Sequence, residues 1–171
     1  MPINGAVAHA NIKTYPVINV DFSTERTSLG TFMSLGDHER SIRFGKTIHR
    51  DGNIISAYVL LGFDSDVTPT ESGHIIARLW RNDGIDIANF MCELRAPVEA
   101  NEASVRFGGL AEMYTGTVSE IFQTGLDDGS ERRVNTVSVA RGDTIIAEWE
   151  SFGPITASPN RYATVSLEIA G

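Results

Sequence analysis

The chain has 171 residues, which is the size of one ordinary domain. Its 42% hydrophobic and 21% charged residues are close to the globular average, which excludes disorder or a fibrous repeat over the whole length. The net charge of −8 argues against a general nucleic-acid binder, and no apolar run approaches the ~20 residues of a membrane-spanning helix.

The first 30 residues differ from the rest of the chain. Residues 1–14 are small, polar and only patchily apolar, and residues 23–30 have the composition of a loop. We therefore predict an extended N-terminal arm or loop over residues 1–30 and a single β-sandwich domain over residues 31–171. The alternative is a frayed terminus followed by an edge strand at residues 15–22. Because the chain starts without the basic and apolar parts of a secretory signal, we expect a cytoplasmic protein, or a virion-surface protein if it is viral.

Charge is unevenly distributed along the chain. Residues 38–50 carry four cations against Glu39, whereas residues 96–131 carry seven acids against Arg106 and so have a net charge of −6. Two solvated faces would explain this pattern, and so would complementary contacts between subunits. The residues that we name as possible interaction residues are Arg40, Arg43, Lys46, Arg50, Glu112, Glu120, Asp127 and Asp128.

Apolar residues alternate with polar ones along most of the chain, and turn residues separate the runs. Residues 58–63 are almost wholly apolar, so we expect that strand to be central and covered on both faces. Candidate strands lie at about residues 15–22, 40–49, 54–63, 74–81, 85–94, 103–107, 112–122, 132–140, 143–150 and 161–169. Short strands at this spacing predict an all-β, antiparallel β-sandwich of jelly-roll type with about 8–10 strands.

One thiol and four aromatic residues are candidates for chemistry or binding. Cys92 is the only cysteine, so no intramolecular disulfide can form, and its apolar neighbours predict a small buried side chain. Aromatic rings that are exposed in line could stack on sugars, whereas core packing is the other interpretation, favoured for the tryptophans. The rings concerned are those of Trp80, Trp149, Tyr114 and Tyr162.

Glu148 and Glu150 flank Trp149 on one predicted strand and therefore point to the same face. Paired carboxylates suggest glycoside hydrolysis, for which Glu112 and Glu120 could supply the opposing acid. Polar alternation on a solvent-facing strand explains the pair as well. The chain has no nucleophile elbow, no phosphate-binding loop and no closely spaced histidine pair, so we predict no catalytic, cofactor-binding or metal-binding residue.

The C-terminal part of the chain carries the pattern Val137-x-Val139-x-x-Gly142-Asp143-x-Ile145-x-Ala147-x-Trp149, followed by Tyr162-x-x-Val165-x-Leu167-x-Ile169. Within it, residues 141–143 spell the adhesion tripeptide Arg-Gly-Asp, at a point where a hairpin turn is needed. The pattern resembles the last strands of compact trimeric jelly rolls, the tumour-necrosis-factor and complement-type globular domains. The resemblance covers about the last 35 residues and implies a jelly roll capable of forming trimers, with no catalytic residue.

These observations favour a non-enzymatic structural or interaction protein. We expect a jelly-roll capsid decoration (cement) subunit, trimeric by preference, that docks on a major capsid protein or another assembly through its N-terminal arm and subunit contacts. The alternatives are a carbohydrate- or receptor-binding β-sandwich module and a small β-sandwich glycoside hydrolase. We expect no cofactor, no nucleic-acid partner and no membrane partner.

Overall fold

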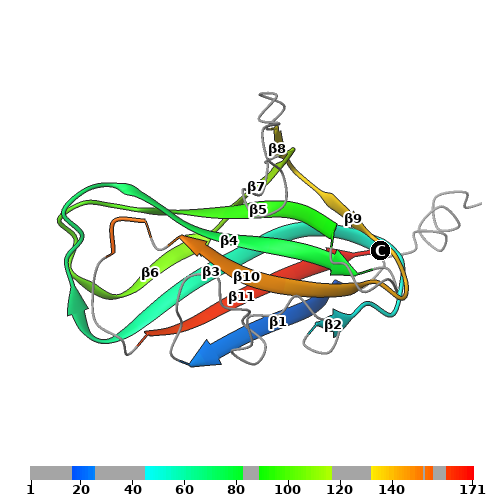
Figure 1. The fold of residues 1–171 in the computed structure, drawn as a ribbon, viewed down its shortest axis with the longest axis horizontal. Coiled ribbons are helices and arrows are strands. Elements are labelled where there is room, and N and C mark those ends of the chain that lie inside the picture. The colour runs from blue at the N-terminus through cyan, green and yellow to red at the C-terminus, as the bar shows by residue number, and fades with distance from the viewer. Residues whose placement is uncertain (1–16, 26–44, 83–88, 117–131, 152, 156–160) are drawn as a thin grey trace, which may run out of the picture.

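The computed structural model describes residues 17–25, 45–82, 89–116, 132–151, 153–155 and 161–171. Within these residues, two antiparallel β-sheets pack on one another as a β-sandwich (Figure 1), which confirms the predicted fold class. The strands are β1 (Ile18–Glu25), β2 (Lys46–Thr47), β3 (Gly52–Val67), β4 (Gly73–Asn82), β5 (Asn89–Val98), β6 (Ser104–Leu110), β7 (Glu112–Thr115), β8 (Arg132–Val134), β9 (Val137–Val139), β10 (Thr144–Ser151) and β11 (Arg161–Ala170).

The strand order is that of a jelly roll. The first sheet has the order β1-β11-β3-β6, with β9 also paired to β3, and the second sheet has the order β2-β10-β4-β5-β7-β8. The pairs β1–β11, β2–β10, β3–β6 and β4–β5 are nested, as when one long antiparallel hairpin is folded over on itself. This nesting is the two-Greek-key layout of double-sheet jelly rolls, so the predicted topology is confirmed.

The core lies between the two sheets and follows the period-two alternation of the sequence. On β11, Ala163, Val165, Leu167 and Ile169 are all buried, as their spacing predicts, and Trp149 of β10 is fully buried opposite them in the same cluster. Burial of each large aliphatic side chain contributes about 1.5–3 kcal/mol to folding. The strands near the C-terminus therefore supply much of the core that holds the two sheets together.

The N-terminal strand belongs to the sandwich. β1 pairs with β11 along its whole length, from Ile18 opposite Ile169 to Glu25 opposite Tyr162. Phe22 is buried in the main core. Residues 18–25 lie within the predicted arm of residues 1–30, and they form an edge strand, whereas residues 1–16 and 26–30 lie outside the described residues.

The prediction that the apolar strand at residues 58–63 is covered on both faces is wrong. β3 is central, between β11 and β6, but Tyr58 and Leu60 are exposed on its outer face. In a two-layer sandwich each sheet has one inner face, and alternate residues of a strand point away from it. An unbroken apolar run therefore leaves half of its side chains outside the core.

Three predicted strands also differ in their bounds from the strands that the structure describes. The predicted strand at residues 132–140 is two strands, because the chain leaves the second sheet after β8 and joins the first sheet as β9. Of the predicted strand at residues 40–49, Lys46–Thr47 forms β2, and residues 40–44 lie outside the described residues. Of the predicted strand at residues 112–122, β7 covers residues 112–115, and residues 117–122 are likewise not described.

Candidate functional site

An apolar strip runs across the outer face of the first sheet. We define the apolar strip as Tyr58 and Leu60 of β3, Leu110 of β6 and Tyr162 of β11, all large and all exposed. Tyr58 is directly opposite Leu110, and directly opposed residues of paired strands share a face. Tyr162 is directly opposite Gly62, which lies two residues beyond Leu60 on that same face. The topology thus gathers side chains from three strands into one patch.

Gly62 accommodates the ring of Tyr162 on the sheet surface. A Cβ atom at Gly62 would overlap the ring atoms of Tyr162, so the ring lies directly over the glycine backbone. Glycine in a strand interior weakens the strand and commonly marks a place where another group approaches closely. Here the approaching group is the exposed aromatic ring of Tyr162.

A row of charged residues crosses the outer face of the second sheet. Across the sheet, Glu148 of β10 lies opposite Arg78 of β4, Arg78 lies opposite Glu93 of β5, and Glu93 lies opposite Tyr114 of β7. Glu148, Arg78 and Glu93 are buried, which is unusual for charged groups unless they are paired. Arg78 Nη2 donates to Glu150 Oε1 over 2.5 Å, and Arg78 Nε lies 3.8 Å from Glu93 Oε1.

The carboxyl group of Glu150, which accepts a hydrogen bond from Arg78, has a raised pKa. Burial and, secondly, the negative charge of Glu93 raise the pKa of Glu150 from 4.5 to about 7, against the opposing effect of the Arg78 guanidinium. Glu93 is itself held by Arg95, whose Nη2 and Nε lie 2.7 Å and 3.0 Å from Glu93 Oε2. Glu150 and Glu93 therefore share Arg78 of β4, and Glu93 has a second partner in Arg95 of its own strand.

The structure changes the interpretation of the predicted carboxylate pair. Glu148 and Glu150 do lie on one face, as their spacing predicts, but Glu148 is only 3% exposed, so this is not a solvent-facing strand. The opposing carboxylate is Glu93, which the sequence analysis did not single out, whereas Glu112 lies farther across the sheet, opposite Arg95. Glu120 lies outside the described residues. A charged residue inside the apolar run of residues 90–94 was the one available signal for Glu93.

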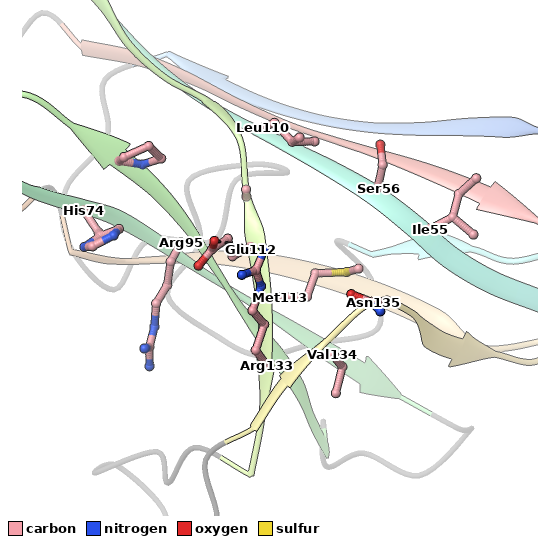
Figure 2. A pocket seen from close by; sticks show the side chains of 12 residues that line it. Ile55, Ser56, His74, Arg95, Leu110, Glu112, Met113, Arg133, Val134 and Asn135 are labelled. Atoms are coloured by element: carbon pink, nitrogen blue, oxygen red, sulfur yellow. Dashed lines mark ion pairs between the residues drawn. The ribbon is translucent and has the colours of Figure 1, made fainter.

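An open pocket lies at one edge of the sandwich, where β6 of the first sheet gives way to β7 of the second (Figure 2). Its volume is about 440 Å³, within the range of small-molecule sites. The apolar part of its lining includes Ile55, Leu110, Met113 and Val134. The polar part includes Ser56, His74, Arg95, Glu112, Arg133 and Asn135.

Two hydrogen-bonded partners hold the carboxylate of Glu112 in this pocket. Arg133 Nη2 lies 3.0 Å from Glu112 Oε1, and the Tyr114 hydroxyl donates to Glu112 Oε2 over 2.7 Å. That donated hydrogen bond raises the pKa of the Tyr114 hydroxyl, because Glu112 stabilises its proton. The Arg95 guanidinium lies 4.1 Å from the centre of the Tyr114 ring, a cation–π contact. The polar side of the pocket is thus organised by contacts within the protein.

Of the predicted interaction residues, the structure describes Lys46, Arg50 and Glu112. Lys46 lies on β2, at one edge of the second sheet, and Glu112 lies on β7, near the opposite edge of that sheet. Arg50 follows β2 and lies close to the backbone of Gly171. The remaining predicted residues, Arg40, Arg43, Glu120, Asp127 and Asp128, lie outside the described residues.

The fold also decides the roles of the candidate sugar-stacking aromatic residues and of the Arg-Gly-Asp tripeptide. Trp149 is in the main core, and Trp80 is buried in a second cluster with Ile146, so neither tryptophan offers a ring to a sugar, whereas Tyr162 is exposed. Residues 141–143 form the predicted turn between β9 and β10, in which Gly142 has a φ of 94°. Asp143 is buried, and its carboxylate accepts a hydrogen bond from the Ala140 amide just before the turn. The tripeptide therefore has the geometry of a hydrogen-bonded turn.

No family model, no curated protein and no solved structure matches this chain. Among the described residues, no three His, Cys, Asp or Glu side chains are grouped so that they could hold a metal ion. The described part of the chain also has no helix with the length and hydrophobicity needed to cross a membrane. The candidate sites are therefore judged on their geometry and chemistry.

Proposed function

We propose that the protein is a non-enzymatic jelly-roll subunit that associates with further copies of itself through the apolar strip. The observation that carries this proposal is the gathering of Tyr58, Leu60, Leu110 and Tyr162 on one sheet face. Contiguous exposed apolar surface on a folded domain is typical of a protein interface. Aromatic side chains are also enriched at the centre of such interfaces, where a polar rim surrounds them.

A second copy of the chain is the occupant that suits this face. The strip is bordered on β11 by Thr164 opposite Leu60 and by Ser166 opposite Tyr58. Charged groups of both signs lie beside it on the same face, with Asp21 of β1 opposite Ser166 and Arg106 of β6 opposite Gly62. Further copies of the same chain can pair these opposite charges across the polar rim of an interface, where the charged groups keep contact with water. The resemblance of the C-terminal strands to trimeric jelly rolls favours three copies.

We further propose that the trimer decorates a larger assembly and that this assembly is a virus capsid. Double-sheet jelly rolls recur in capsid proteins, which supports the class of assembly. In this proposal, residues 1–16 attach the subunit to the major capsid protein. The buried positions of Glu148 and Glu93 leave neither carboxylate accessible to a substrate, which supports a non-enzymatic role.

Light scattering coupled to size-exclusion chromatography tests the self-association. We expect the full chain at tens of micromolar to elute at three times its 18.6 kDa mass, and Leu60→Lys to elute as a monomer. Val105→Lys is the matched control, because Val105 is 39% exposed against 38% for Leu60 but lies outside the strip. A monomeric wild type, or a Leu60→Lys variant that remains trimeric, would contradict the proposal.

Removal of residues 2–16 tests the attachment separately. Because β1 begins at Ile18, this deletion leaves the first sheet intact. We expect the shortened chain to stay trimeric and to lose co-sedimentation with capsid shells of the same source that lack the protein. Full co-sedimentation of the shortened chain would disprove the role of the arm without affecting the self-association.

A further inference from the structure

We propose that the pocket at the edge of the sandwich binds an acidic sugar, a pyranose that carries one carboxylate. This inference goes beyond the proposed assembly and does not depend on it, because the pocket is complete within one subunit. It is built where β6 ends at Leu110 and the chain passes to β7 in the other sheet (Figure 2). The two sheets consequently supply opposite walls, with Ile55 from one and Val134 from the other.

The composition of the walls selects an amphipathic ligand. About half of the lining is apolar, and the rest offers donors and acceptors on side chains of different strands. A fatty acyl chain would cover the side-chain amide of Asn135 and the carboxylate of Glu112 without offering either a hydrogen-bond partner, which is costly. A pyranose has an apolar C–H face that packs on side chains such as Leu110, and a rim of hydroxyl groups that both donate and accept hydrogen bonds.

The fixed carboxylate of Glu112 supplies the acceptor that sugar hydroxyls need. Each carboxylate oxygen has room for a second donor, so the contacts with Arg133 and Tyr114 leave Glu112 able to accept from a ligand. Because these contacts already hold its position, binding does not have to order it. The amide of Asn135 adds a group that can both donate and accept. The hydroxyl of Ser56 donates to Glu168 over 2.6 Å and adds an acceptor.

The donors of Arg133 that its ion pair does not use select a ligand with a single negative charge. The Arg133 side chain is 62% exposed, and its ion pair with Glu112 uses Nη2, so the rest of its five-donor fork faces solvent. Arg95, the other arginine of the lining, is already paired with Glu93. One available guanidinium matches one carboxylate, with which it forms a bidentate contact. A phosphate, with nearly two charges, would be opposed by Glu112.

Two sugars that differ in one group provide the test. D-Glucuronate and D-glucose share the pyranose ring, and only the first carries a carboxylate. In saturation-transfer NMR and in titrations of the isotope-labelled full chain, we expect millimolar binding of glucuronate, roughly tenfold tighter than that of glucose. Absence of glucuronate binding, or equal affinity for the two sugars, would overturn the proposal.

Two neighbouring arginines provide the matched variants. Arg133→Gln should weaken glucuronate binding roughly tenfold and glucose binding much less, because the Tyr114 hydroxyl still holds Glu112. Arg132→Gln, which removes the same charge from an exposed residue of β8 outside the lining, should change neither affinity by more than about twofold. An equal loss in both variants would show an unspecific charge effect and overturn the assignment. Glucuronate binding by the Leu60→Lys variant should equal that of the wild type, which separates the pocket from the apolar strip.

Discussion

Replacement of Glu150 by glutamine should change how the stability of the fold depends on pH. Because burial raises the pKa of Glu150 from 4.5 in the unfolded chain to about 7 in the folded one, the folded state binds the proton more tightly. The stabilisation from that proton is complete below pH 4.5 and is lost as the pH rises through 7. The full shift corresponds to about 3 kcal/mol, and since the side chain is 26% exposed, solvent screening reduces this to roughly 1–2 kcal/mol.

Urea denaturation of the full chain between pH 5 and pH 8, at one protein concentration, measures this effect through the fluorescence of the two buried tryptophans. Relative to wild type, Glu150→Gln should gain roughly 1–2 kcal/mol across that interval, whatever the constant offset from its altered contact with Arg78. Glu102→Gln, at an exposed position, should follow the wild type. A constant difference between Glu150→Gln and wild type over the whole interval would refute the reasoning.

Three further experiments test the packing of the fold. Gly108→Ala should cost about 2–6 kcal/mol of unfolding free energy, because the φ of Gly108 is 104° and the new Cβ would overlap a backbone carbonyl of β3. Gly109→Ala, at a φ of 145° but with open space around the new Cβ, should cost about 1–3 kcal/mol. Equal losses in the two variants would refute the overlap at Gly108. Burial raises the pKa of the Cys92 thiol to about 12, so a thiol reagent should label Cys92 in urea but not in the native protein, and rapid native labelling would contradict its burial. Asp143→Ala should cost about 1–3 kcal/mol by calorimetry, because it leaves the Ala140 amide without its 2.8 Å acceptor, and an unchanged melting temperature would show that this hydrogen bond contributes nothing.

The apolar strip and the pocket meet at Leu110, which belongs to both. A subunit that docks on the strip therefore approaches one wall of the pocket. Tyr58, opposite Leu110, follows Ser56 of the pocket by two residues along β3. If the subunits associate through the strip, the pockets lie beside the subunit contacts, and the variants at Leu60 and Arg133 can be combined to ask whether a bound sugar and subunit association influence each other.

The sequence by itself determined the sheet class and the inner face of its regular strands. The alternation of residues 161–169 identified four core residues correctly, because side chains of a strand point to opposite faces with a strict period of two. Gly142 was likewise predicted correctly as part of a turn, since a positive φ is favourable for glycine. Both features depend on backbone geometry that neighbouring residues set.

The tertiary structure alone decided which faces and which partners these residues have. The apolar run predicted Tyr58 and Leu60 to be buried, but the fold places both on the outer side of a two-layer sandwich. The carboxylate that faces Glu150 proved to be Glu93, 57 positions away, because β4 lies between their strands and supplies the arginine for both. The pocket likewise unites segments that are distant in sequence. Long-range strand pairing sets these neighbours, and a local periodicity carries no information about which strand will lie alongside.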